Sequence, residues 1–93
     1  MLLSGKYMPE QEVSIVTDRY PHGDTLCVTL SNGVRLSINV PESALLKDNE
    51  FVFKNYSENT GLLESCLKAG IVELTGEKIR TGFVVCPVVR LLV

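Results

Sequence analysis

A chain of 93 residues has the size of one domain, and we expect residues 1–93 to form a single one, with the weakest pattern in the first 20. A hydrophobic content of 45% is too high for a disordered chain. The net charge is −2, and nine basic residues are interspersed with eleven acidic ones. This layout argues against nucleic acid as a partner, because phosphate binding needs a concentrated basic face.

The cysteines give no sign of a disulfide framework, a zinc site or another cofactor. Cys27, Cys66 and Cys86 are odd in number and far apart, and the single histidine, His22, has no cysteine near it. We expect the cysteines to be small core residues in a reducing compartment. The N-terminus is too briefly apolar for a signal peptide, and no stretch reaches the roughly 20 apolar residues of a membrane span. The sequence therefore predicts a cytoplasmic protein with no cofactor and no membrane partner.

The first predicted elements are a half-buried strand over residues 12–18, where apolar and polar residues alternate, and a turn over residues 21–24. Two more alternating strands, 26–30 and 34–40, flank a hairpin signal at Asn32-Gly33. A two-residue loop would pair apolar with polar residues. A three-residue loop with Gly33 in the left-handed conformation pairs apolar residues throughout: Leu30 with Val34, Val28 with Leu36, and Leu26 with Ile38. The sequence predicts this second register.

The middle of the chain predicts a loop, a short strand and a helix. Pro41 is expected to end the hairpin, and Leu45 or Leu46 to reach the core from a loop or helical turn over residues 42–50. Residues 51–53 predict a short strand. A helix follows, because one apolar stripe is formed by Leu62, Leu63, Cys66 and Leu67. We expect Asn59 or Thr60 to cap its start and Gly70 its end.

The last predicted elements are a strand over residues 71–74, a turn at Thr75-Gly76 and a strand over residues 83–92. The final strand is apolar on both faces apart from Arg90, while Pro87 favours an edge or a bulge. Together the elements predict an α+β fold with a mainly antiparallel sheet of about five strands and one helix packed on one face.

Candidate site residues are few. A polar segment offers an aromatic hydroxyl, amides and both charge signs to a partner, although a helix-capping loop is the simpler explanation. The segment comprises Lys54, Asn55, Tyr56, Ser57 and Glu58. Arg80 and Arg90 are candidates for anchoring an acidic partner or are ordinary solvated charges. Nothing in the sequence predicts a catalytic residue.

One helix is too short to cover both faces of the last strand, so we expect the apolar residues Val84, Val88 and Leu92 to meet a second copy in a homodimer. The alternative is that the N-terminal segment folds across that face within one chain, with its apolar residues Leu2, Leu3, Tyr7 and Met8.

A series of short motifs resembles a family of short uncharacterised bacterial proteins that are often carried on plasmids, phages and other mobile elements. The motifs lie at residues 51–54, 57–62, 68–76 and 81–91. The resemblance implies a bacterial cytosolic setting and an accessory role, and it supplies no catalytic or binding residues.

Two functions follow as hypotheses. The first is a non-enzymatic protein-binding module encoded by a mobile element, acting as an inhibitor of a host defence system. The second is a small enzyme or metabolite-binding protein whose site is assembled in space.

Overall fold

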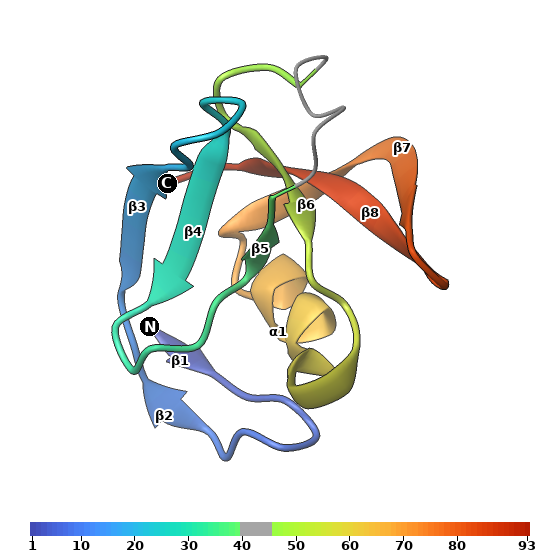
Figure 1. Cartoon of the computed structure of the whole chain (residues 1–93). Helices are drawn as coiled ribbons and strands as arrows, with labels where there is room; N and C mark the ends of the chain where they lie inside the picture. The colour runs from blue at the N-terminus through green and yellow to red at the C-terminus, as the bar shows by residue number, and fades with distance from the viewer. Residues whose placement is uncertain (40–45) are drawn as a thin grey trace.

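The structure, a computed structural model, describes residues 1–39 and 46–93 and has the predicted α+β class (Figure 1). In chain order the strands are β1 (Leu2–Leu3), β2 (Gln11–Glu12), β3 (Ile15–Arg19), β4 (Leu26–Leu30), β5 (Ser37–Ile38), β6 (Glu50–Phe53), β7 (Val72–Thr81) and β8 (Val84–Leu91). A 3₁₀ turn (Ser57–Asn59) and helix α1 (Leu62–Lys68) lie between β6 and β7. No helix in the described ranges is long and apolar enough to cross a membrane.

The strands form three antiparallel sheets, so the prediction of one sheet of about five strands is wrong. Strands β1 and β2 pair with each other, β3 pairs with β4, and the third sheet has the order β5-β6-β8-β7. The reason for the division is found between β4 and β5, where the chain leaves one sheet and enters the next.

The predicted hairpin register is confirmed next to the loop, but the predicted pair of Leu26 with Ile38 is wrong, because Ile38 pairs with Val52 of β6. Thr29 pairs with Arg35, and Gly33 has φ 95° in the three-residue loop. The amide of Leu36 donates to the carbonyl of Val28 at 2.9 Å, and there the ladder stops. Beyond it, the next strand is β5, which pairs with β6 rather than with β4.

Ser37 makes this departure possible. Its hydroxyl oxygen accepts the Val28 amide at 2.9 Å, while the Leu36 carbonyl accepts the Lys54 amide at 2.7 Å. Alternation placed Ser37 on the polar face, yet it is 1% exposed. Its side chain therefore replaces a backbone partner inside the core.

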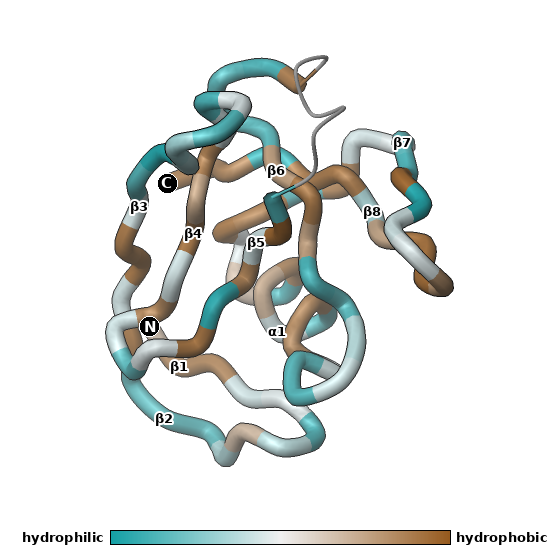
Figure 2. Tube along the Cα trace, in the orientation of Figure 1, coloured by the Kyte–Doolittle hydropathy of each residue, from teal (hydrophilic) through white to brown (hydrophobic). Residues whose placement is uncertain are grey.

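The main core lies between the third sheet, α1 and β4 (Figures 1 and 2). Phe51 and Val89, which are paired on β6 and β8, supply the sheet side, and the predicted stripe of α1 packs against it through Leu62, Leu63 and Cys66. The N-terminal segment also enters this core, through Leu3, Met8 and Val13. These residues share the main core with Val89, so the alternative that the N-terminal segment folds across the Val84 and Val88 face is wrong, and Leu2 stays exposed.

A second, smaller core occupies the other face of the third sheet. Val52, Cys86 and Val88 form its centre. Partly buried apolar side chains pack against them: Ile38, Leu46, Tyr56, Ile79 and Val84. Leu46 therefore reaches a core as predicted, whereas the predictions for Pro41 and Leu45 lie outside the described residues.

Helix α1 begins differently from the prediction. Its N-cap is Gly61, with φ 85° and no side-chain cap bond, so neither Asn59 nor Thr60 caps it. Asn59 instead lies buried, and its amide donates to the Arg35 carbonyl at 2.8 Å, which joins the 3₁₀ turn to the chain after the hairpin. Gly70 takes the left-handed conformation after the helix, as predicted, with φ 73°.

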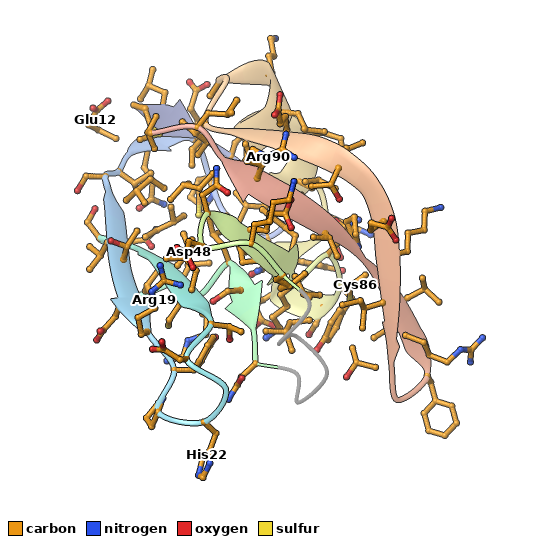
Figure 3. All side chains as sticks on the ribbon, turned by 90° about the horizontal axis from the view of Figure 1, so that it is seen from above. Glu12, Arg19, His22, Asp48, Cys86 and Arg90 are labelled. Carbon is orange, nitrogen blue, oxygen red and sulfur yellow. The ribbon has the colours of Figure 1, made fainter. Side chains whose placement is uncertain are left out.

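Strands β2 and β3 share the region where one strand was predicted. Val13, which lies between them, is buried, whereas β3 is mostly exposed. The turn predicted over residues 21–24 is present, and Figure 3 shows His22 at its outer end, pointing away from the body.

Candidate functional site

The most exposed apolar part of the described chain is a two-stranded arm. Strand β6 pairs with β8 only over residues 88–90, so residues 78–81 of β7 and 84–87 of β8 pair with each other alone. Figure 1 shows the two strands running away from the body, and Figure 2 shows hydrophobic residues at the free end. Phe83 at the end is fully exposed, and the exposed fractions of Leu74 and Val85 are 53% and 52%.

A bulge sets the direction of the arm, where the sequence predicted a turn at Thr75-Gly76. Leu74 pairs with Val89 and Lys78 with Pro87, so the three residues between Leu74 and Lys78 oppose only Val88. Gly76 has φ 92°, which glycine adopts without strain. The Thr75 hydroxyl donates to the Val88 carbonyl at 2.9 Å and fixes the bulge against β8. Strand β7 therefore continues through the predicted turn and bends there.

Pro87 lies where two features of the sheet meet. It is the residue of β8 just beyond the last pair with β6, and it pairs with Lys78 immediately after the bulge. Because proline has no amide hydrogen, this end of the ladder suits it. The prediction that Pro87 marks an edge or a bulge is confirmed.

A groove lies between the arm and the start of α1. Its volume is about 350 Å³, and its apolar lining includes Leu63, Leu74, Val85 and Pro87. Asn55 and Lys78 line it with polar groups, and Glu77 lies at the bulge end. Both the shape and the apolar lining suit a bound side chain.

Two cations share the face of the arm that carries this groove. Lys78 is paired with Pro87 and Arg80 with Val85, and directly paired residues lie on one face of a sheet. Both cations are exposed, and neither forms an ion pair within residues 1–39 and 46–93. The apolar residues of the arm are thus flanked by unpaired positive charge.

The polar segment predicted as a contact site is mostly occupied with itself. The Lys54 ammonium donates to the Glu58 carboxylate and lies 5.6 Å from the centre of the Tyr56 ring. This hydrogen bond is the main reason why the pKa of Glu58 falls to about 2. Ser57 has φ 57°, and its carbonyl oxygen accepts hydrogen bonds from the amide and the hydroxyl of Thr60. Of the five residues, Asn55 is the one that lines the groove.

The two predicted arginines have different surroundings. Arg90 donates to Glu73 at 2.5 Å and to Glu50 at 3.3 Å, in a row across β7, β8 and β6. The hydrogen bond to Glu73 is the largest cause of a raised pKa of Arg90, and the bond to Glu50 adds to it. The charge of Arg90 is therefore paired within the chain. A cavity of about 590 Å³ lies beside this row, with Glu50 and Arg90 in its lining. Arg80, on the arm, remains available to a partner.

The residues predicted for self-association do not form one exposed patch. Val88 is 1% exposed because it lies in the second core, and Val84 is half-buried beside it. Leu92 is 48% exposed. The sequence predicted that the Val84 and Val88 face of the last strand lacks a cover within the chain. This expectation is wrong, because partly buried residues of other elements pack over that face.

The three cysteines lie apart from one another, and none of them is an exposed residue. All three are free thiols, and burial raises the pKa of Cys66 to about 12, which removes the nucleophilic thiolate at neutral pH. Cys27 is half-buried, and Cys86 is buried. In the described ranges, no three His, Cys, Asp or Glu side chains gather where they would hold a metal ion.

Sequence reasoning missed the groove, although part of its signal was present. The sequence predicts a last strand that is apolar on both faces, including the face of Val85 and Pro87, but it places Leu63 only in the helix stripe and gives Lys78 no role. Because Thr75-Gly76 was interpreted as a turn, the continuation of β7 into the arm was not predicted. The alternation of Lys78 and Arg80 opposite that apolar face is the pattern that would have indicated it.

Comparisons of the chain with protein-family models, with curated proteins and with solved structures find no match.

Proposed function

We propose that this chain is a small protein-binding module with no catalytic role, and that it holds its partner at the groove between the arm and α1. The observation that carries the proposal is the exposure of Leu74 and Val85 in the lining of a groove of about 350 Å³. Exposed apolar residues gathered around a concave site are typical of protein interaction surfaces.

The setting belongs to the same proposal. Three free cysteines suit a reducing compartment, which favours the cytoplasm. The resemblance to short bacterial proteins of mobile elements favours a bacterial host, and in that host we infer that the partner is a host protein, such as a component of a defence system.

Metabolite binding, in a small enzyme or a carrier, is the second candidate. It is favoured by the volume of the groove, which reaches the lower end of the range for small-molecule sites, and by the polar groups of Asn55 and Lys78 in its lining. Nucleic acid is disfavoured, because the two cations of the arm belong to a chain of net charge −2.

A homodimer is a further candidate, since Leu92 and Val93 are 48% and 70% exposed beyond the end of β8. The burial of Val88 means that such a contact would use the surface residues around β8 and leave the second core intact.

The test is affinity purification from a bacterial lysate with two matched variants. Val85→Asp places a charge at the groove, whereas Val16→Asp places the same charge on β3 at a residue that is also 52% exposed. We expect one protein to be recovered reproducibly with the wild type and with Val16→Asp, and to be lost with Val85→Asp. Circular dichroism checks that both variants fold.

Equal recovery with all three proteins would show that the groove is not the binding site. Failure of the wild type to retain any protein, together with retention of a metabolite, would favour the second candidate instead.

A further inference from the structure

The charges on the arm specify what kind of partner the groove fits, provided that the groove is the binding site proposed above. Lys78 and Arg80 stand two residues apart on one face of β7, so about 6.5–7 Å separates them along the strand. This is also the distance between alternate side chains of any extended segment. In a partner strand beside β7, two side chains at alternate positions can therefore face the two cations, one opposite Lys78 and the other opposite Arg80.

Strand β7 has room for such a segment. It is the last strand in the order β5-β6-β8-β7, so one of its edges has no partner strand among the described residues. Residues 78–81 of that edge belong to the arm, where β8 is the one paired strand, and the side chain of Ile79 packs on the second core. Addition of an extended segment to a free edge is a common way of binding peptides.

The position of Glu77 orients the segment. Glu77 belongs to the bulge and lines the groove there, as Leu74 does, whereas Arg80 lies nearer the tip. A carboxylate of the partner is repelled at the bulge end and attracted toward the tip. An apolar side chain fits the bulge end, where Leu63 and Leu74 line the groove.

We propose that the groove and the arm bind an extended segment of a partner protein that carries acidic residues at two alternate positions, facing Lys78 and Arg80, followed toward the body by an apolar side chain that enters the groove.

A second copy of this chain fits the same surface less well. When two copies meet through the groove faces of their arms, Lys78 and Arg80 of each approach the same cations of the other, and like charges repel. Lysine on an edge strand also discourages pairing between edges. Carboxylates of another protein meet neither obstacle.

Synthetic peptides test the inference directly. The probes are three fluorescent ten-residue peptides with Thr at the neutral positions and one Leu two residues after the charged pair. They carry Asp-Thr-Asp, Asn-Thr-Asn or Lys-Thr-Lys, and anisotropy measures binding at low salt. We expect the aspartate peptide to bind the wild type roughly two- to thirtyfold more tightly than the asparagine peptide, which is the range expected from two cross-strand charge pairs. High salt should reduce the difference.

Charge reversal supplies the decisive comparison. The double variant Lys78→Glu/Arg80→Glu should lose the aspartate peptide and gain the lysine peptide, while Lys68→Glu, which reverses an exposed charge on α1, should behave as the wild type. Equal binding of all three peptides to the wild type, or no binding of any up to about 1 mM, would overturn the acidic-segment inference. The proposed function would survive that result if Val85→Asp still abolished recovery of the cellular partner, and both would fall if it did not.

Discussion

At the scale of single residues, Ser37 shows how one side chain redirects the chain. Its hydroxyl oxygen lies 2.8 Å from the Tyr20 hydroxyl and accepts the Val28 amide, and its surroundings are almost fully closed to water. A small hydroxyl is needed because it must reach a backbone amide that the departing strand no longer satisfies. Alternation cannot reveal this role, since the partner of Ser37 is an amide nine residues away that any regular hairpin would have paired with the backbone.

We predict that Ser37→Ala lowers the free energy of unfolding by about 1–3 kcal/mol, because it leaves the buried Val28 amide without an acceptor. Tyr20→Phe removes the other hydroxyl and leaves that amide bonded, so we expect a smaller loss of about 0.5–1.5 kcal/mol. Urea denaturation followed by circular dichroism measures both. A Tyr20→Phe loss larger than that of Ser37→Ala would contradict the role assigned to the Val28 bond.

At the scale of elements, the sequence predicted the helix and the strands whose position depends on residues close together in the chain. The register of the hairpin followed from apolar residues meeting on one face, and the stripe of α1 followed from helical spacing. The separation of β5 from β4 could not be foreseen, because the Leu36 carbonyl accepts the amide of Lys54, a residue far along the chain. The groove was hidden for the same reason. Leu63 on the helix meets Val85 on the arm only after the bulge at Gly76 has bent β7.

Gly76 is the element-scale test. A Cβ added there meets no atom within 4 Å, so any effect of substitution arises from its φ of 92° and not from crowding. We expect Gly76→Ala to lower the free energy of unfolding by about 1–2 kcal/mol, and Gly76→Asn to lower it less, because asparagine tolerates positive φ better. Chemical denaturation of the two variants checks the order. Equal losses, or none, would mean that the bulge takes another backbone conformation in solution.

At the scale of the whole molecule, the two cores explain why an apolar last strand need not cause association. Strand β8 contributes Val89 to the main core and Val88 to the second, so both of its faces are covered within the chain along the middle of the strand. In this part of the chain, the apolar residues that remain exposed lie on the arm, at Leu74 beside the bulge and after β8, and on the arm they are accompanied by two cations.

We therefore expect the protein at about 100 μM and low salt to scatter light as a monomer of 10.3 kDa. Self-association, if it occurs through the arm, should appear only as salt is raised toward about 1 M, where the repulsion between like cations is screened. Lys78→Gln/Arg80→Gln should then associate at lower salt than the wild type. A stable dimer of the wild type at low salt would instead support the contact around Leu92, and Leu92→Asp should dissolve it.

Strand β8 is in effect two strands joined at Pro87. On the body side, Val88 and Val89 lie between two neighbouring strands and belong to the two cores, so we expect their amide hydrogens to exchange with solvent only when the whole domain opens. On the arm side, the strand has a single neighbouring strand. Cys86 there is buried in the second core, but Val84 is half-buried and Val85 is exposed, so we expect the hydrogen bonds of this part to open more often than those of the body. Proline has no amide hydrogen, so hydrogen exchange cannot be measured at Pro87. The boundary between slowly and rapidly exchanging amides therefore falls at the residue of β8 that gives no exchange signal. A partner bound along the arm would erase this boundary, because the arm would then share the protection of the body.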